Sequence, residues 1–129
     1  MAQRLKEKGI EVDLFVSSPA KRAKKTAKYF AAAFKVDKDA VMLVDQLYLA
    51  GPPVFEEVIK SLPDKEDVIT IFAHNPGITE FANTLTNVRI DDMPTCAVFA
   101  VQAKTDTWES FRESEKNFLF FDYPKNPLG

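Results

Sequence analysis

The chain has 129 residues, of which 46% are hydrophobic and 28% charged, a balance typical of one soluble globular domain. Its formal net charge of −2 gives no electrostatic basis for binding nucleic acid, and a single cysteine, Cys96, excludes an internal disulfide framework. Neither a membrane span nor the apolar stretch of a signal peptide is present, so we expect a cytoplasmic protein without a membrane partner.

Helices and strands are predicted to alternate along most of the chain and to end in two consecutive strands. In chain order, the predictions are a helix over 1–9, a strand over Val12–Ser17, a helix over 18–34, a strand over Val41–Val44, a helix over 51–63, a strand over 67–73, a helix over 75–86, and strands over 95–103 and 117–124. This order predicts a three-layer α/β domain with a mostly parallel sheet and one antiparallel strand.

Two features sharpen these predictions. Ser18 is the expected cap of the second helix and Pro19 its first residue, because serine and proline favour those positions. The run "DVITIFA" is apolar at nearly every position, as expected for a parallel strand covered on both faces.

Two strand-to-helix connections share a design. "VSSPAKR" and "FAHNPGI" each run from an apolar strand through a polar residue and a proline into a helix. Ligands bind at this edge of open α/β sheets, and helix N-termini attract anions. Arg22 can reach back over the edge and grip a phosphate with two hydrogen bonds. If the two strands are neighbours, Arg22 and His74 converge on one pocket, where Gly77 would permit close approach of an oxygen.

Simpler interpretations exist for each residue. A single histidine at a strand end is often a hydrogen-bonded structural residue, and Arg22 lies in a lysine-rich helical face. Cys96 is expected to be a small buried hydrophobe within a strand. Asp91 and Asp92 have no second acidic cluster to complete a metal site, so we expect a solvated turn and no metal.

The motif "SSPAKRAKKTA" resembles a signature of the histidine phosphatase superfamily, and "AHNPGI" resembles its second-histidine motif. The length and the ending "FLFFDYPK" are similar to SixA-like phosphohistidine phosphatases. The resemblance implies a phosphoglycerate mutase-like fold and catalysis without cofactors. It matches Arg22 to a pocket arginine and His74 to the second histidine, which hold the phosphoryl oxygens. The Asn75 backbone N–H would add a donor, and Ser17 at the other strand end is a further candidate phosphate ligand.

The chain departs from the family at one motif. It contains no Arg-His-Gly and has only one histidine, so the family's nucleophile and first pocket arginine are missing. We expect a domain, residues 1–129, that is truncated at its N-terminus and inactive as given. The missing strand would lie centrally, between the strand that ends at His74 and the one expected to contain Cys96. Either those strands pair directly, or a partner chain fills the gap; a homodimer through exposed sheet edges is a further alternative.

Three functions remain open. The leading hypothesis is a phosphohistidine phosphatase that acts on phosphorylated signalling or phosphotransfer proteins, or on a small phosphorylated substrate. The alternative is a non-catalytic module of the same fold that keeps Arg22 and His74 to bind inorganic phosphate or sulfate. A receiver-like domain is disfavoured, because the strand ends carry Ser17 and His74 instead of an acidic cluster and a lysine. The general acid is unassigned, with Asp45 the nearest candidate.

Overall fold

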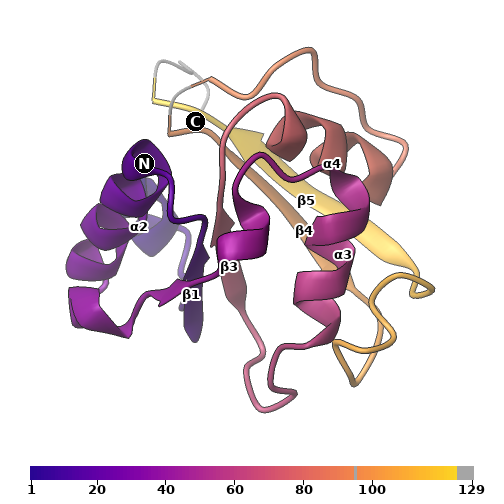
Figure 1. Ribbon diagram of the computed structural model, residues 1–129, viewed down its shortest axis with the longest axis horizontal. Helices are drawn as coiled ribbons and strands as arrows, with labels where there is room; N and C mark the ends of the chain where they lie inside the picture. Colours follow the sequence, from indigo (N-terminus) through magenta and orange to yellow (C-terminus); the bar gives the residue numbers. More distant parts are fainter. Residues whose placement is uncertain (95, 125–129) are drawn as a thin grey trace.

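Two small sheets with helices around them make up the fold (Figure 1). The computed structural model describes residues 1–94 and 96–124. The first residue of the predicted strand over 95–103 lies outside the described residues, as does Lys125 of the "FLFFDYPK" motif. No described helix is long and apolar enough to cross a membrane.

The predicted order of helices and strands is confirmed, with shorter bounds. The elements are α1 Ala2–Glu7, β1 Leu14–Ser17, α2 Lys21–Ala33, β2 Met42–Leu43, α3 Pro52–Lys60, β3 Ile69–Phe72, α4 Gly77–Leu85, β4 Val98–Ala103 and β5 Lys116–Asp122, with short 3-10 helices η1 Lys38–Ala40 and η2 Asp45–Leu47.

Helices α2 and α4, which follow the two connections of shared design, both begin later than predicted. The N-cap of α2 is Ala20, and the Ser18 hydroxyl instead accepts a hydrogen bond from the Ala20 N–H at 3.1 Å. A serine that bonds the backbone two residues on forms a turn, and this turn delays the helix. The N-cap of α4 is Pro76. The two connections are therefore short loops, not direct strand-to-helix joints.

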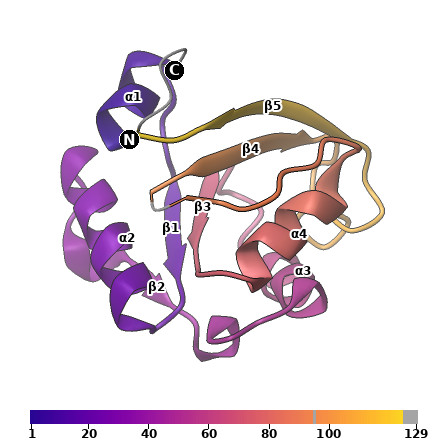
Figure 2. The ribbon, with the colours of Figure 1, turned by 90° about the horizontal axis from the view of Figure 1, so that it is seen from above.

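The parallel sheet has helices on both faces. Its strand order is β2-β1-β3, and β1 pairs in parallel with both neighbours. Figure 2 shows α1 and α2 on one side of this sheet and α3 and α4 on the other. Successive residues of β1 face opposite sides, so Phe15 joins the core under α1 and α2 while Val16 joins the core under α3 and α4. This arrangement confirms the α/β class and its helix–sheet–helix layers.

The prediction of a mostly parallel sheet with one antiparallel strand is confirmed in part, because the described strands form a parallel sheet of three strands and a separate antiparallel pair. Within the described residues, β4 pairs antiparallel with β5 and not with β3. The pair is anchored at both ends: Arg4 of α1 reaches Asp122 at 3.1 Å, and the Trp108 indole N–H donates to the Glu66 carbonyl at 2.8 Å. These anchors hold the pair in place beside β3 without a ladder between them. Direct pairing of β3 with β4, the first of the alternatives given for this gap, is thus not adopted within the described residues.

Candidate functional site

His74 lies just beyond the carboxyl end of β3, where the chain turns towards α4. Its imidazole is half-buried and meets the Tyr48 ring edge-on, with ring centroids 6.0 Å apart. Nδ1 of His74 is buried, and no described residue forms a hydrogen bond with it. A buried polar atom without a partner is costly, so this atom marks a place where a further group is expected.

Arg22 lies in the first turn of α2 with an exposed side chain. Strands β1 and β3 are parallel neighbours, with Ser17 opposite Phe72, so the connections that carry Arg22 and His74 start side by side. The Ser18 N–H donates to the Phe72 carbonyl at 2.9 Å, which joins the two connections directly. The two strands are therefore neighbours, which was the condition for Arg22 and His74 to lie on one pocket.

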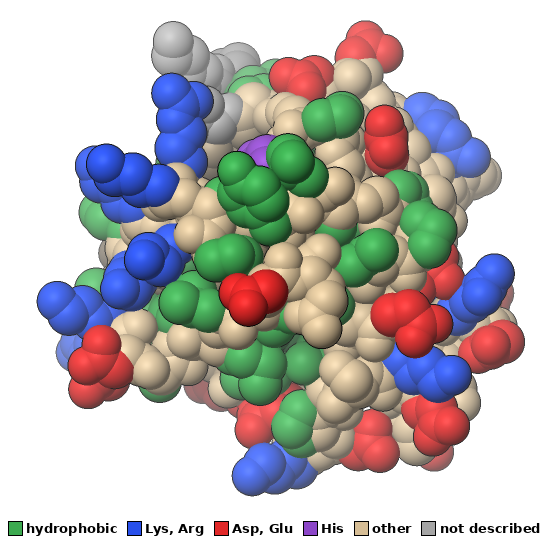
Figure 3. Space-filling view, viewed as in Figure 1, with side chains coloured by type: hydrophobic (Ala, Val, Ile, Leu, Met, Phe, Trp, Pro, Cys, Tyr) green, Lys and Arg blue, Asp and Glu red, His purple; other side chains and the backbone are tan. Residues whose placement is uncertain are grey.

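Arg22 and His74 line the same cleft, which has a volume of about 1380 Å³. Tyr48 and Asn75 border it with them. In Figure 3 the histidine is partly visible beside apolar side chains, and Lys and Arg side chains gather over α2. The first turn of α2 contains no acidic residue, so the start of this helix, with its N–H groups and basic side chains, favours an anion.

Asn75 fixes the loop between β3 and α4. Its side-chain amide donates to the Met93 carbonyl at 3.0 Å, and its side-chain oxygen accepts from the Thr79 hydroxyl. The amide side chain is therefore committed to the loop. No described residue accepts a hydrogen bond from the Asn75 backbone N–H, which is the group that the resemblance implied as a phosphate donor.

Ser17 is fully buried, and its hydroxyl donates to the Ser18 carbonyl at 2.8 Å. It does not line the cleft that Arg22 and His74 share. The structure thus places Arg22, His74 and Asn75 along one large cleft and leaves Ser17 out of its lining. Asp45, the candidate general acid, is exposed in η2 and does not line this cleft either. Cys96 is half-exposed and precedes β4, with a positive φ of 62°, so its predicted place in a buried strand is wrong.

The segment over 48–51 was not predicted as part of the site. Tyr48 lines the large cleft, whereas Leu49, Ala50 and Gly51 line a second cavity of about 140 Å³, which His74 also lines. The segment follows η2 and has no periodic pattern, so the sequence offered no signal beyond Gly51 and the two prolines that come after it.

Gly77 lets this segment rest on the start of α4. A Cβ atom built at Gly77 would lie 1.9 Å from the Ala50 carbonyl oxygen, a backbone atom that cannot rotate away. We expect Gly77→Ala to lower the free energy of unfolding by about 1–3 kcal/mol, as overpacking of a filled site does. Urea unfolding measures this loss, with Gly51→Ala as the control, because the nearest heavy atom there lies at 3.9 Å. Equal effects in the two variants would contradict the close approach.

Comparison with known proteins identifies similar structures but no sequence family. No protein-family model matches the sequence, and no curated protein matches it. The fold resembles the putative phosphohistidine phosphatase SixA from Nakamurella multipartitia, with 16% identity and a TM-score of 0.72 over 97% of this chain and 78% of that one. It also resembles the putative SixA from Agrobacterium tumefaciens, with 18% identity and a TM-score of 0.70 over 95% of this chain and 77% of that one. At these identities, the likeness establishes the fold.

Proposed function

We propose that this chain is the phosphate-binding part of a phosphohistidine phosphatase whose substrates are phosphorylated signalling or phosphotransfer proteins. The observation that carries the proposal is that Arg22 and His74, from separate connections at one sheet edge, line one cleft. The fold shared with two SixA structures supports it. A phosphoryl group in this cleft would meet a guanidinium, an imidazole and the start of a basic helix.

Each group has a definite role in phosphoryl transfer. Arg22 binds two phosphoryl oxygens, and His74 donates a hydrogen bond to a third, so both stabilise the charge of the transition state. In the reaction that the resemblance implies, a second imidazole attacks phosphorus, the P–N bond of the substrate breaks, and the departing imidazole takes a proton. Water then attacks the phosphorylated enzyme and releases phosphate. Residues 1–129 contain no second histidine to perform the attack.

The second candidate function is a non-catalytic phosphate-binding module of the same fold. The single histidine favours it, because residues 1–129 can hold a phosphoryl group but have no imidazole left to attack it. Both candidate functions use the same phosphate-binding site. They differ in the turnover that is expected once a second histidine is added as the nucleophile.

We expect the 129-residue chain to bind inorganic phosphate and to show negligible turnover of an aryl phosphate or of phosphoimidazole. Calorimetric titration measures the binding, and released phosphate measures the turnover. Arg22→Gln should weaken binding by about tenfold or more, since a charge-assisted hydrogen bond contributes about 1.5–3 kcal/mol.

Lys25→Gln is the matched control, because Lys25 is an exposed cation on the same helix that does not line the cleft. Equal losses in the two variants would show a diffuse effect of charge and contradict the site. Turnover well above buffer would contradict the assignment of the missing histidine as essential.

A further inference from the structure

Two consecutive apolar side chains, those of Tyr48 and Leu49, are exposed next to His74. They are 56% and 72% exposed, whereas the residues on either side, Leu47 and Ala50, are buried. The Tyr48 ring contacts the His74 ring, and Leu49 lines the small cavity with His74. Figure 3 shows apolar side chains around the histidine on this surface. A single exposed apolar residue is ordinary, so it is the position of this pair beside the candidate site that calls for an explanation.

The backbone that carries the pair is held in an unusual conformation. Leu49 has a φ of 55°, in the left-handed region that residues with a side chain rarely adopt. The next residue is fixed on both sides, because the Ala50 N–H donates to the Leu47 carbonyl at 3.3 Å and the Ala50 carbonyl packs against Gly77. Such conformations persist where the surrounding structure fixes them, and they cluster at functional sites. The backbone next to Tyr48 is therefore held in place before any ligand binds.

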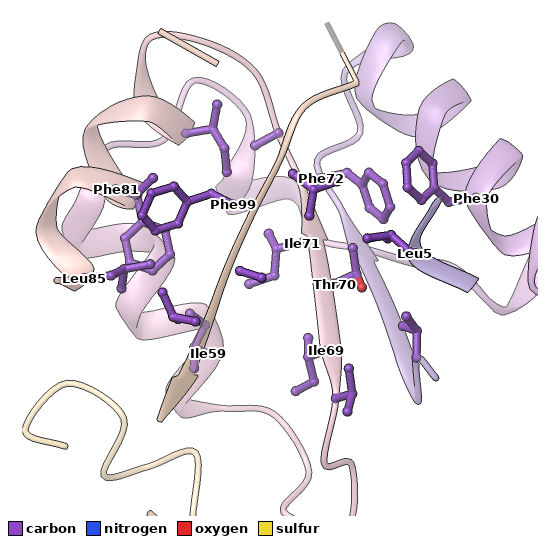
Figure 4. A pocket seen from close by; sticks show the side chains of 18 of the residues that line it. Leu5, Phe30, Ile59, Ile69, Thr70, Ile71, Phe72, Phe81, Leu85 and Phe99 are labelled. Carbon is purple, nitrogen blue, oxygen red and sulfur yellow. The ribbon is translucent and has the colours of Figure 1, made fainter. Parts of the chain in front are cut away.

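The part of the large cleft along β3 is lined by apolar side chains. In Figure 4 they lie on both sides of this strand: Leu5, Phe30, Ile59, Phe81 and Leu85. A phosphoryl dianion is excluded from apolar surroundings unless it is paired, so in the proposed function it binds at Arg22 and His74 instead. The group bonded to phosphorus then lies within reach of Tyr48, which lines the same cleft and whose ring centroid is 6.0 Å from that of His74.

On the basis of the proposed function, we infer that Tyr48 is a specificity-determining residue, whose ring stacks on a flat aromatic leaving group such as the imidazole of phosphohistidine. Stacked aromatic rings attract each other beyond the apolar area that they bury. More than half of Tyr48 is exposed while its ring contacts His74, so the residue has surface left for a second ring. Phosphoserine and phosphothreonine present no ring to Tyr48. The site therefore favours phosphoryl groups carried by aromatic rings over those carried by aliphatic side chains.

The test uses the 129-residue chain and three phosphonates, whose P–C bond is not hydrolysed. Calorimetric titration compares methylphosphonate, phenylphosphonate and cyclohexylphosphonate. We expect phenylphosphonate to bind about three- to tenfold more tightly than methylphosphonate, the usual gain from a stacked aromatic pair. It should also bind more tightly than cyclohexylphosphonate, which has a ring of the same number of carbon atoms that is not flat.

Three variants assign this preference to one ring. Tyr48→Ala should bring the affinities for phenylphosphonate and methylphosphonate close to each other, and Tyr48→Phe should keep the preference because it keeps the ring. Tyr29→Ala is the matched control, since Tyr29 is 69% exposed and lines neither cavity. A merely structural role of Tyr48 would weaken the binding of all three phosphonates together and leave their ratios unchanged.

The outcomes separate this inference from the proposed function. Binding of methylphosphonate with no preference for phenylphosphonate would overturn the inference and leave the phosphate site standing. A preference that Tyr48→Ala leaves unchanged, or that cyclohexylphosphonate shares in full, would overturn it as well. If none of the three phosphonates binds, the proposed function is contradicted, and the role of Tyr48 is contradicted with it.

Discussion

Adding an N-terminal strand that ends in Arg-His-Gly is expected to convert the chain into an active phosphatase. The extension would carry the first strand and following loop that the resemblance to the histidine phosphatase superfamily implies. We expect turnover of phosphoimidazole to rise by roughly 10³-fold or more over the 129-residue chain. The reason is that a nucleophile held against a bound phosphoryl group gains a large effective molarity. Release of inorganic phosphate, followed continuously, measures the change.

Two variants of the extended protein separate chemistry from folding. An extension that ends in Arg-Ala-Gly should fill the cleft and stabilise the protein without giving turnover. In the active extended protein, His74→Gln should lower kcat by about 10²–10³, the cost of removing one donor to transition-state charge. If the Arg-Ala-Gly extension were as active as the Arg-His-Gly one, the proposed phosphatase mechanism would be wrong.

Phe55→Ala is expected to lower the free energy of unfolding by about 3–5 kcal/mol, the usual cost of deleting a buried aromatic side chain. Phe55 is fully buried in α3 and stacks on Phe81 of α4, with ring centroids 4.8 Å apart. This pair holds together the two helices that form one wall of the cleft. Chemical unfolding monitored by circular dichroism measures the loss.

Tyr29→Ala is the control for this substitution, because Tyr29 is an aromatic residue with 69% of its surface exposed. It should change stability by no more than about 0.5 kcal/mol. A similar loss in both variants would mean that the stacked pair is not the source of the stability.

Side-chain periodicity predicted the helices well but not how they begin. Ala23, Ala27 and Phe30 recur at helical spacing and are buried as expected. The start of α2 shifted because the Ser18 hydroxyl bonds the Ala20 N–H before the helix begins. Such local competition depends on backbone angles, which residue type alone leaves open.

The apolar sequence of β3 predicted a parallel strand covered on both faces, but not which strands pair with it. The apolar run correctly indicated a parallel strand between two helix layers. Periodicity reports the two faces of a strand, while hydrogen bonding occurs at its edges. The sequence therefore could not show that, among the described residues, β3 and β4 do not pair with each other.

The candidate site could also be predicted only in part, because the sequence does not give the register and orientation of strand side chains. Arg22 and His74 were proposed because each lies where a strand is followed by a helix, and the parallel pairing of β1 and β3 places the starts of these two connections side by side. Ser17 was proposed from its place at a strand end, but its side chain faces the interior. A shift of one residue reverses the face of a strand side chain, so its orientation needs the register. Tyr48 lies in an irregular segment and left no pattern to detect.

The most direct measurement uses the fact that the chain has one histidine. Its imidazole NMR signals are therefore assigned without further variants. On titration with inorganic phosphate, we expect the His74 signals to shift and saturate at the same affinity that calorimetry gives. Arg22→Gln should weaken this response by about tenfold, and Lys25→Gln should leave it unchanged. Imidazole signals that stay fixed while phosphate binds would show that His74 and Arg22 do not share an anion site.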